Sequence, residues 1–253
     1  NRWNALPGNR HQHGASSRVL MTTLLCIHGW PMTSATFSTL AGALPDVNIV
    51  ASDLPGFGGI SDDGFEHSLD AYADYVTAMA ERIPGGVHLL GLSMGGKIAM
   101  DIAARQPDWL QSLILLAPSY PDATIVSPDV LTSQLAAFAN VDALTALVSG
   151  WASDTAPLVA WAQLASRDAY AWWLTDGRPA DIANVVGDIS APTLVLHGEN
   201  DPLRTVELLQ TTIVGRLHDA ELMVIAGASH CIQLDQPHIT AGILQDWIAH
   251  HGG

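Results

Sequence analysis

The stretch "HLLGLSMGGKIAM", residues 88–100, places a serine between glycines at the point where one pattern of apolar residues ends and another begins. Before the serine, the apolar run 87–90 indicates a short buried strand that ends at Gly91. After it, apolar residues recur at helical spacing over 98–103. Ser93 is therefore predicted to lie on a turn from a strand into a helix.

The same alternation of strands and helices continues on both sides of this turn. Apolar runs predict strands at 23–27, 48–52, 87–91, 112–117, 193–197 and 221–225. Helical patterns lie at 35–44, 69–82, 94–105, 205–213 and 238–250. This order is typical of an α/β protein, so we expect a mostly parallel, doubly wound sheet with helices on both faces.

One interval, residues 118–187, contains Pro-punctuated helical patterns and no strand-like run. We expect it to be a helical cap inserted between two core strands. The core would then comprise 23–117 and 188–253. An N-terminal segment, residues 1–22, precedes it, and the sequence leaves open whether that segment is native or vector-derived.

Composition narrows the range of functions. Ten Lys and Arg against 25 Asp and Glu give a net charge of −15, which would repel a nucleic acid backbone. No apolar run approaches the ~18 residues that a membrane span needs, and no secretion signal is visible, so we expect a cytoplasmic location. Cys26 and Cys231 are predicted to be reduced thiols rather than a disulfide.

The opening stretch contains the motif G-x-S-x-G, from Gly91 to Gly95. In an open parallel sheet, ligands bind beyond the carboxyl ends of the strands, which is where this turn would lie. Small residues allow a sharp turn that exposes the serine hydroxyl. The motif alone fits either a tight turn or a nucleophile, because a serine also needs a base and an orienting acid.

Candidates for both partners follow later strands. Asp201 comes after the strand predicted at 193–197, and His230 comes after the strand predicted at 221–225. The order Ser93, Asp201, His230 is typical of one class of serine hydrolases. Glu199 is an alternative acid only two residues before Asp201.

With these residues in place, the chain resembles the α/β-hydrolase superfamily from about residue 23 to residue 250. The segments "CIHGWP" (26–31), "DLPGFGGIS" (53–61) and "PTLVLHGENDP" (192–202) are similar to motifs of that family. The resemblance implies that Ser93 is the nucleophile, His230 the base and Asp201 the acid. It also implies an oxyanion hole made by the backbone N–H groups of Trp30 and Met94.

The function that this resemblance implies is hydrolysis of a small carboxylic ester through an acyl-enzyme, with no cofactor and no metal. A serine at position 93, where epoxide-opening and dehalogenating relatives carry an aspartate, favours acyl transfer to water. Other reactions of the scaffold remain alternatives: lactone cleavage, carbon–carbon bond hydrolysis and cofactor-free perhydrolysis. A receptor that uses the pocket without turnover is a further alternative, and the oligomeric state stays open.

Two expectations concern individual side chains. Aromatic residues are concentrated in the segment predicted to form the cap, and we expect an apolar acyl pocket lined by Trp151, Trp161, Trp172 and Phe138. Lys97, the only lysine of the chain, follows Ser93 by one helical turn. We expect its side chain to face solvent or a neighbouring carboxylate and assign it no chemistry.

Overall fold

A computed structural model describes residues 22–252. The expectation for the N-terminal segment concerns residues that lie almost entirely outside this range. The described chain forms a six-stranded sheet in the order β2-β1-β3-β4-β5-β6, and every neighbouring pair of strands is parallel. The strands are β1 (Thr23–Ile27), β2 (Asn48–Ala51), β3 (Val87–Leu92), β4 (Leu110–Leu116), β5 (Thr193–Gly198) and β6 (Ala220–Ile225).

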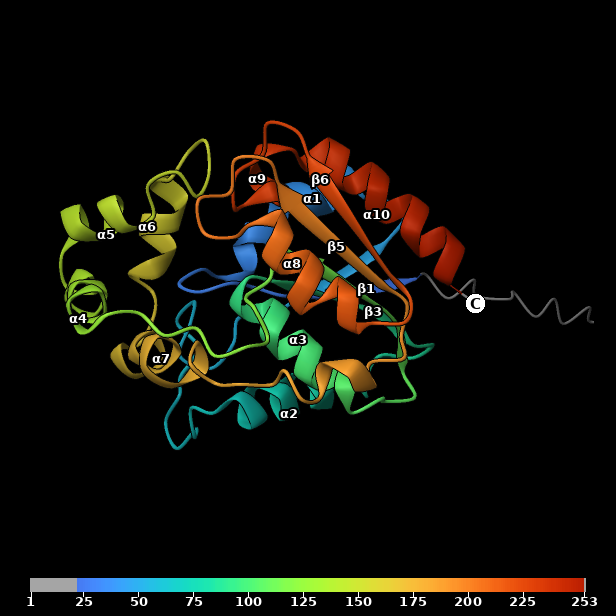
Figure 1. Cartoon of the computed structure of the whole chain (residues 1–253), viewed down its shortest axis with the longest axis horizontal. Helices are drawn as coiled ribbons and strands as arrows, with labels where there is room; N and C mark the ends of the chain where they lie inside the picture. The colour runs from blue at the N-terminus through green and yellow to red at the C-terminus, as the bar shows by residue number, and fades with distance from the viewer. Residues whose placement is uncertain (1–21, 253) are drawn as a thin grey trace, which may run out of the picture.

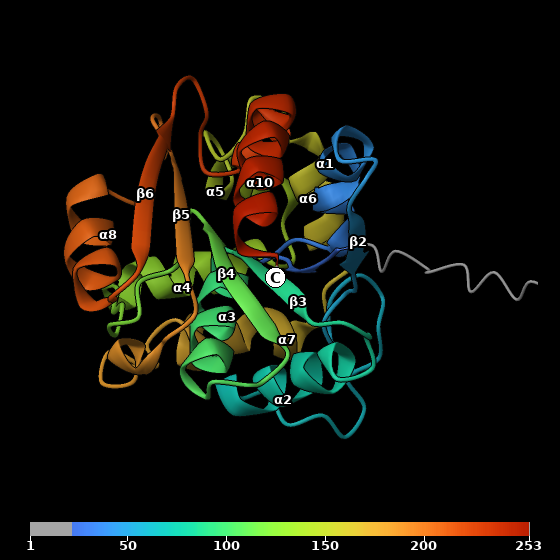
Figure 2. The same ribbon diagram turned by 90° about the vertical axis from the view of Figure 1, so that its right-hand side faces the viewer.

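Helices cover the sheet on both faces, which confirms the predicted α/β class (Figures 1 and 2). A short 3₁₀ turn, η1 (Ser34–Phe37), leads into α1 (Ser38–Ala43), and α1 packs with α10 (Pro237–His251) on one face. On the other face, α2 (Leu69–Ala80) packs against α3 (Met94–Ala104). The remaining core elements are α8 (Val206–Thr212), η4 (Val214–Arg216) and α9 (Ile232–Asp235).

The central strands consist mainly of apolar residues because both of their faces are covered. β1, β3 and β5 are buried along their whole length. Their side chains join those of the covering helices in one continuous hydrophobic core. Cys26 and Cys231 are free thiols buried in this core. Within residues 22–252, no helix has both the length and the apolar character that crossing a membrane requires.

The chain between β4 and β5 is helical wherever it is regular. It contains α4 (Pro128–Ala137), α5 (Val141–Leu147), α6 (Ala156–Ala162), α7 (Arg167–Trp172), η2 (Trp173–Gly177) and η3 (Val186–Asp188). The side chains of Ser127, Asn140 and Ser166 cap the first turns of α4, α5 and α7. Helices α4–α7 lie together on the left of Figure 1, apart from the helices that cover the sheet.

Several backbone hydrogen bonds attach this helical segment to the core, and two groups of them lie away from its ends. Ser166 N donates to Gly56 O at 2.7 Å, and Gly59 N donates to Leu164 O at 3.2 Å. On the opposite side, Cys231 N donates to Trp151 O at 2.7 Å. The second attachment links the helical segment to the loop that follows β6.

Candidate active site

Ser93 occupies a strained turn between β3 and α3. Its backbone angles are φ 52° and ψ −110°, a left-handed conformation that is costly for a residue other than glycine. The two flanking glycines permit this turn. A Cβ on Gly91 would lie 2.3 Å from the carbonyl oxygen of Gly95, and a Cβ on Gly95 would lie 2.4 Å from Ile27 O.

Neighbouring backbone groups hold the turn in place. Ser93 N donates to Leu116 O at 3.0 Å, and the carbonyl of Ser93 accepts from Ser119 N at 2.9 Å. Both partners belong to the end of β4 and the residues just after it. The serine side chain is almost buried, with 6% of the residue exposed. Ser93 is therefore fixed at the carboxyl edge of the sheet.

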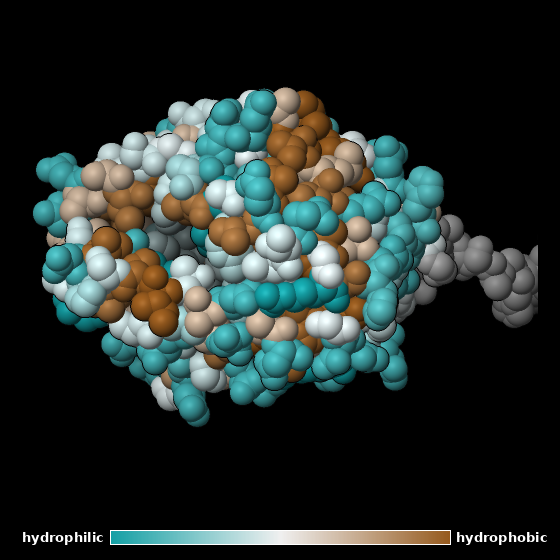
Figure 3. Space-filling view, in the orientation of Figure 1, coloured by the Kyte–Doolittle hydropathy of each residue, from teal (hydrophilic) through white to brown (hydrophobic). Residues whose placement is uncertain are grey.

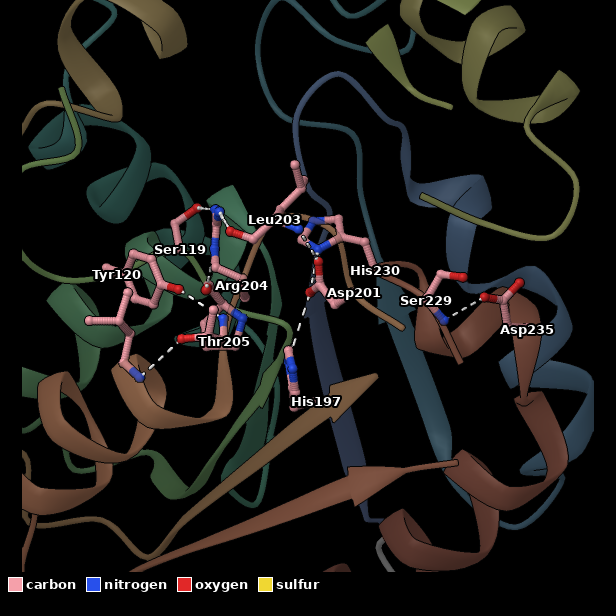
Figure 4. Close-up of polar contacts among 12 residues, drawn as sticks. Ser119, Tyr120, His197, Asp201, Leu203, Arg204, Thr205, Ser229, His230 and Asp235 are labelled. Carbon is pink, nitrogen blue, oxygen red and sulfur yellow. Dashed lines mark hydrogen bonds and ion pairs between the residues drawn. The ribbon is translucent and has the colours of Figure 1, made fainter. Parts of the chain in front are cut away.

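Asp201 and His230 form a buried pair on the loops after β5 and β6 (Figure 4). His230 Nδ1 lies 2.9 Å from Asp201 Oδ2, and both side chains are fully buried. The second carboxylate oxygen, Asp201 Oδ1, accepts from Leu203 N at 2.7 Å. Of the two acids considered from the sequence, Asp201 contacts the histidine ring. Glu199 instead accepts from Gly227 N at 2.9 Å.

Electrostatics favour an ionised Asp201. Burial raises the pKa of the Asp201 carboxyl, but the facing His230 ring and the Leu203 N–H outweigh burial and hold this pKa below its ordinary value. The carboxylate is thus charged at neutral pH and accepts the Nδ1 proton of His230. That bond selects the tautomer whose Nε2 is free to accept a proton.

His230 Nε2 is buried and has no hydrogen-bond partner among the described residues. The structure records no hydrogen bond between His230 and Ser93 in this part of the chain. The Asp201–His230 half of the predicted triad is thus joined directly. Ser93 lies on the same edge of the sheet, at the end of β3.

A second histidine, which the sequence analysis did not single out, stands beside the acid. His197 is the last residue but one of β5, and its Nδ1 lies 3.8 Å from Asp201 Oδ2. Burial lowers the pKa of His197, so its ring is neutral at neutral pH. The sequence signal was the histidine within "LHGEND", which could have been flagged because it precedes the acid loop directly.

Trp30 and Met94, whose backbone N–H groups are the predicted oxyanion donors, are both near Ser93, in the structure or in the chain. Met94 is the first residue of α3, and Trp30 follows Gly29, at which a Cβ would lie 3.2 Å from Ser93 Cβ. Within residues 22–252, neither amide donates a hydrogen bond to another residue. His28 shapes this turn, since its Nε2 accepts from Leu54 N at 3.1 Å.

The four predicted pocket residues lie in different surroundings. The Trp151 ring packs edge-on against His230, with 5.6 Å between ring centroids. Phe138 contacts Tyr170, which in turn packs on the Trp30 ring at 4.8 Å. Trp172 packs instead against Tyr72 of α2, at 4.6 Å, and Trp161 is half-buried on α6. Of these four residues, only Trp151 therefore contacts the His230 ring.

The surface is hollowed between α4–α7 and the body of the protein, and apolar residues lie near the rim of this hollow (Figure 3). Asp235 links the two sides of this region, because its carboxylate accepts from Ser229 N at 2.8 Å and from Ser153 N at 2.7 Å. It thereby holds the loop of His230 next to the segment that carries Trp151. Asp235 belongs to no recognisable motif in the sequence and was therefore not predicted.

The expectation for Lys97 is wrong. The side chain is fully buried, and its Nζ donates to the carbonyl of Arg178 at 3.0 Å and to that of Ala180. The chain that follows η2 covers this face of α3, which the position of Lys97 in the sequence did not reveal. Burial lowers the pKa of Lys97 to about 8.

No group of three or more His, Cys, Asp or Glu side chains suited to a metal ion occurs within the described range.

Comparisons with known proteins give a consistent family. A family model described as "Alpha/beta hydrolase family" matches residues 24–243. A pimeloyl-[acyl-carrier protein] methyl ester esterase from Aromatoleum aromaticum is 25% identical over 252 residues, which cover 88% of this chain and 96% of that protein. A protein with the same description from Shewanella woodyi is 33% identical over 96 residues, which cover 38% of this chain and 36% of that protein.

Solved structures share the fold. The esterase EaEST from Exiguobacterium antarcticum superposes with a TM-score of 0.79 at 19% sequence identity. The superposition covers 90% of this chain and 92% of the esterase. At this identity, the similarity establishes the fold of the chain.

Proposed function

Because the chain belongs to the alpha/beta hydrolase family, we propose that it is a serine hydrolase that cleaves small carboxylic esters through an acyl-enzyme. The observation that carries the proposal is the buried pair of Asp201 and His230, whose Nδ1 and Oδ2 lie 2.9 Å apart. This pair leaves His230 Nε2 without a partner among the described residues, on the edge of the sheet that also carries the strained Ser93.

The reaction follows from these groups. His230 Nε2 removes the hydroxyl proton of Ser93 while the serine oxygen bonds to the carbonyl carbon of the ester. The resulting imidazolium then gives its proton to the departing alcohol as the carbon–oxygen bond breaks. In the second half, His230 takes a proton from water, the hydroxide attacks the acyl-serine, and the carboxylic acid leaves as Ser93 is reprotonated.

Asp201 remains ionised throughout and holds the imidazole in the productive tautomer. In each half-reaction, the backbone N–H groups of Trp30 and Met94 would donate to the oxyanion. Their lack of other acceptors among the described residues supports this assignment. Removing one such donor typically costs about 3–4 kcal/mol of transition-state stabilisation.

We further propose that residues 118–187 act as a cap over a core formed by 23–117 and 188–253. The contact of Trp151 with His230 supports an acyl pocket on this side of the site. Phe138 would contribute through Tyr170, whereas Trp172 packs on α2 and Trp161 makes no aromatic pair among the described residues. A pocket bounded in this way favours acyl chains of up to roughly eight carbons, with each accommodated methylene adding at most ~0.8 kcal/mol.

From the relatives' substrate, we carry over to this chain only the ester bond and not the acyl-carrier protein. By their descriptions, those relatives act on a methyl ester of a pimeloyl group held by an acyl-carrier protein. We propose a free, small ester as the substrate class, because the buried pair and the aromatic side chains beside it are suited to an uncharged acyl group.

Hydrolysis of p-nitrophenyl acetate, butyrate, octanoate and palmitate, together with aliphatic lactones and ring-fission acids, tests the proposal. The Ser93→Ala protein serves as the blank. We expect the short and medium esters to be hydrolysed fastest and the palmitate at least tenfold more slowly, with all activity absent from the blank. Turnover that the Ser93→Ala protein retains, or turnover of the ring-fission acids alone, would contradict the proposed reaction.

A further inference from the structure

Arg204 lies three residues after Asp201 and is partly buried between its own loop and the residues that follow β4 (Figure 4). Its guanidinium donates across to the residues that follow β4: Nε to Pro118 O at 3.0 Å, and Nη2 to Ser119 Oγ at 2.8 Å. Nη1 donates within its own loop, to Leu203 O at 2.9 Å. A single side chain thus joins the loop of Asp201 to the start of the helical segment between β4 and β5.

The segment that Arg204 holds is the one that holds the nucleophile turn. Ser119 accepts from Arg204 through its hydroxyl, while its backbone N–H donates to the carbonyl of Ser93 at 2.9 Å. Ser119 is therefore in direct contact with both Arg204 and Ser93. A second hydrogen bond joins the same two segments: Thr205 N donates to the hydroxyl of Tyr120 at 3.0 Å.

Arg204 is partly buried although it carries a charge, and this needs an explanation. Every hydrogen bond recorded for its guanidinium goes to a neutral oxygen, and no carboxylate of the described chain lies within ion-pair distance of it. Burying a cation without a paired anion is costly. Burial lowers the pKa of Arg204, and Asp201 opposes that effect. An apolar side chain would fill the same space without this cost.

We propose that Arg204 is a positioning residue for the Asp201–His230 pair. It binds the acid loop to the segment that fixes Ser93, and it places a permanent positive charge close to the Asp201 carboxylate. This inference rests on the proposed function, since it assigns Arg204 a part in the same reaction.

The charge should act on the pH dependence of the reaction. The charged and titratable groups near Arg204 are Asp201 from its own loop, Tyr120 after β4, Lys97 from α3, Arg178 after η2 and His197 from β5, which also lies near Glu207 of α8. Asp201 is the anion that acts most strongly on Arg204. Removing the cation leaves the Asp201 carboxylate free to stabilise a protonated His230, so inactivation by acid should begin at higher pH.

The test compares Arg204→Lys, Arg204→Met and Ser119→Ala with wild type in p-nitrophenyl butyrate hydrolysis from pH 5 to pH 9. Arg105→Met is the matched control, because Arg105 pairs with Asp70, Asp74 and Asp101 on the outer surfaces of α2 and α3. Thermal unfolding of each protein separates loss of fold from loss of positioning.

We expect Arg204→Lys to lower kcat by about tenfold with little change in KM, because the planar fork is lost while the charge stays. Arg204→Met should lower kcat further and move the acid limb of the kcat/KM profile upward by roughly half a pH unit. Ser119→Ala should lower kcat by a few fold and leave the acid limb in place, and Arg105→Met should match wild type.

Retention of wild-type kcat and an unmoved acid limb in Arg204→Met would overturn the inference, even if its melting temperature fell. If Arg204→Met does not fold, the double variant Ser119→Ala/Arg204→Lys decides. If the two residues act through one shared hydrogen bond, the fold decrease in kcat of the double variant must be smaller than the product of the fold decreases of the two single variants. A decrease equal to that product would overturn the inference. An inactive wild type would refute the proposed function instead.

Discussion

At the scale of single residues, hydrogen bonds separate two similar candidates for the acid of the proposed triad. Glu199 and Asp201 lie on the same loop, and both carboxylates reach toward the chain that follows β6. Glu199 accepts from the backbone of Gly227, whereas Asp201 accepts from the ring of His230. Only the second contact can select a histidine tautomer and stabilise its protonated form.

Asp201→Asn should therefore lower kcat/KM for p-nitrophenyl butyrate by about 10³–10⁴-fold, because an amide favours the wrong tautomer of His230. Glu199→Gln removes a charge two residues away while keeping an acceptor for Gly227 N, and we expect a change of less than about threefold. Steady-state kinetics of both variants, with circular dichroism to verify their folding, provides the measurement. A larger loss in Glu199→Gln than in Asp201→Asn would reverse the assignment.

The sequence indicated some of these residues and missed others for a physical reason. Ser93 was singled out because its glycine neighbours mark a tight turn, and the candidates Asp201 and His230 were singled out because each follows a strand. Arg204 and His197 were not found, since their importance depends on contacts between loops that are distant in sequence. Such contacts leave no local pattern of spacing or composition.

At the scale of elements, the strands were predicted well because they are continuous apolar runs bounded by turn residues. The strand predicted at 112–117 spans 110–116, and the one predicted at 193–197 spans 193–198. The helix predicted at 35–44 was less regular, and the structure divides it into the 3₁₀ turn η1 and the short α1. What local patterns did not reveal is which segment covers a helix, and Lys97 on α3 is the clearest case.

Lys97 provides a prediction at this scale, because it ties α3 to the chain after η2. Lys97→Met would leave the carbonyls of Arg178 and Ala180 without their donor, at a cost of about 1–3 kcal/mol in the free energy of unfolding. Part of this cost is offset at neutral pH, where the buried ammonium of the wild type is itself unfavourable.

The stability difference between wild type and Lys97→Met should change with pH in one direction. Burial lowers the pKa of Lys97 from 10.5 to about 8, so between these values the unfolded chain binds a proton that the folded chain does not. The stability of the wild type relative to Lys97→Met should therefore rise as the pH increases from 8 to 10.5, by up to about 3 kcal/mol. Urea unfolding of both proteins at pH 7.5 and pH 10 measures this difference. A constant or shrinking difference would show that Lys97 does not titrate as a buried amine.

At the scale of the whole molecule, the strand order explains how the site is assembled. Ser93 follows β3, Asp201 follows β5 and His230 follows β6, and in the parallel sheet all three strands end at one edge. The order of strands and helices in the sequence was enough to predict this class of fold. The placement of α4–α7 was not predictable in detail, because it depends on contacts such as those of Asp235 and Trp151 with the loop of His230.

The central claim is that Ser93 is the nucleophile of a serine hydrolase, and covalent labelling tests it most directly. The purified protein is incubated with a fluorophosphonate, and intact-mass and peptide mass spectrometry locate the adduct. We predict one adduct per chain, on Ser93, with loss of esterase activity in proportion to labelling and no adduct in the Ser93→Ala protein. An unlabelled wild type, or labelling that persists after Ser93→Ala, would contradict the account.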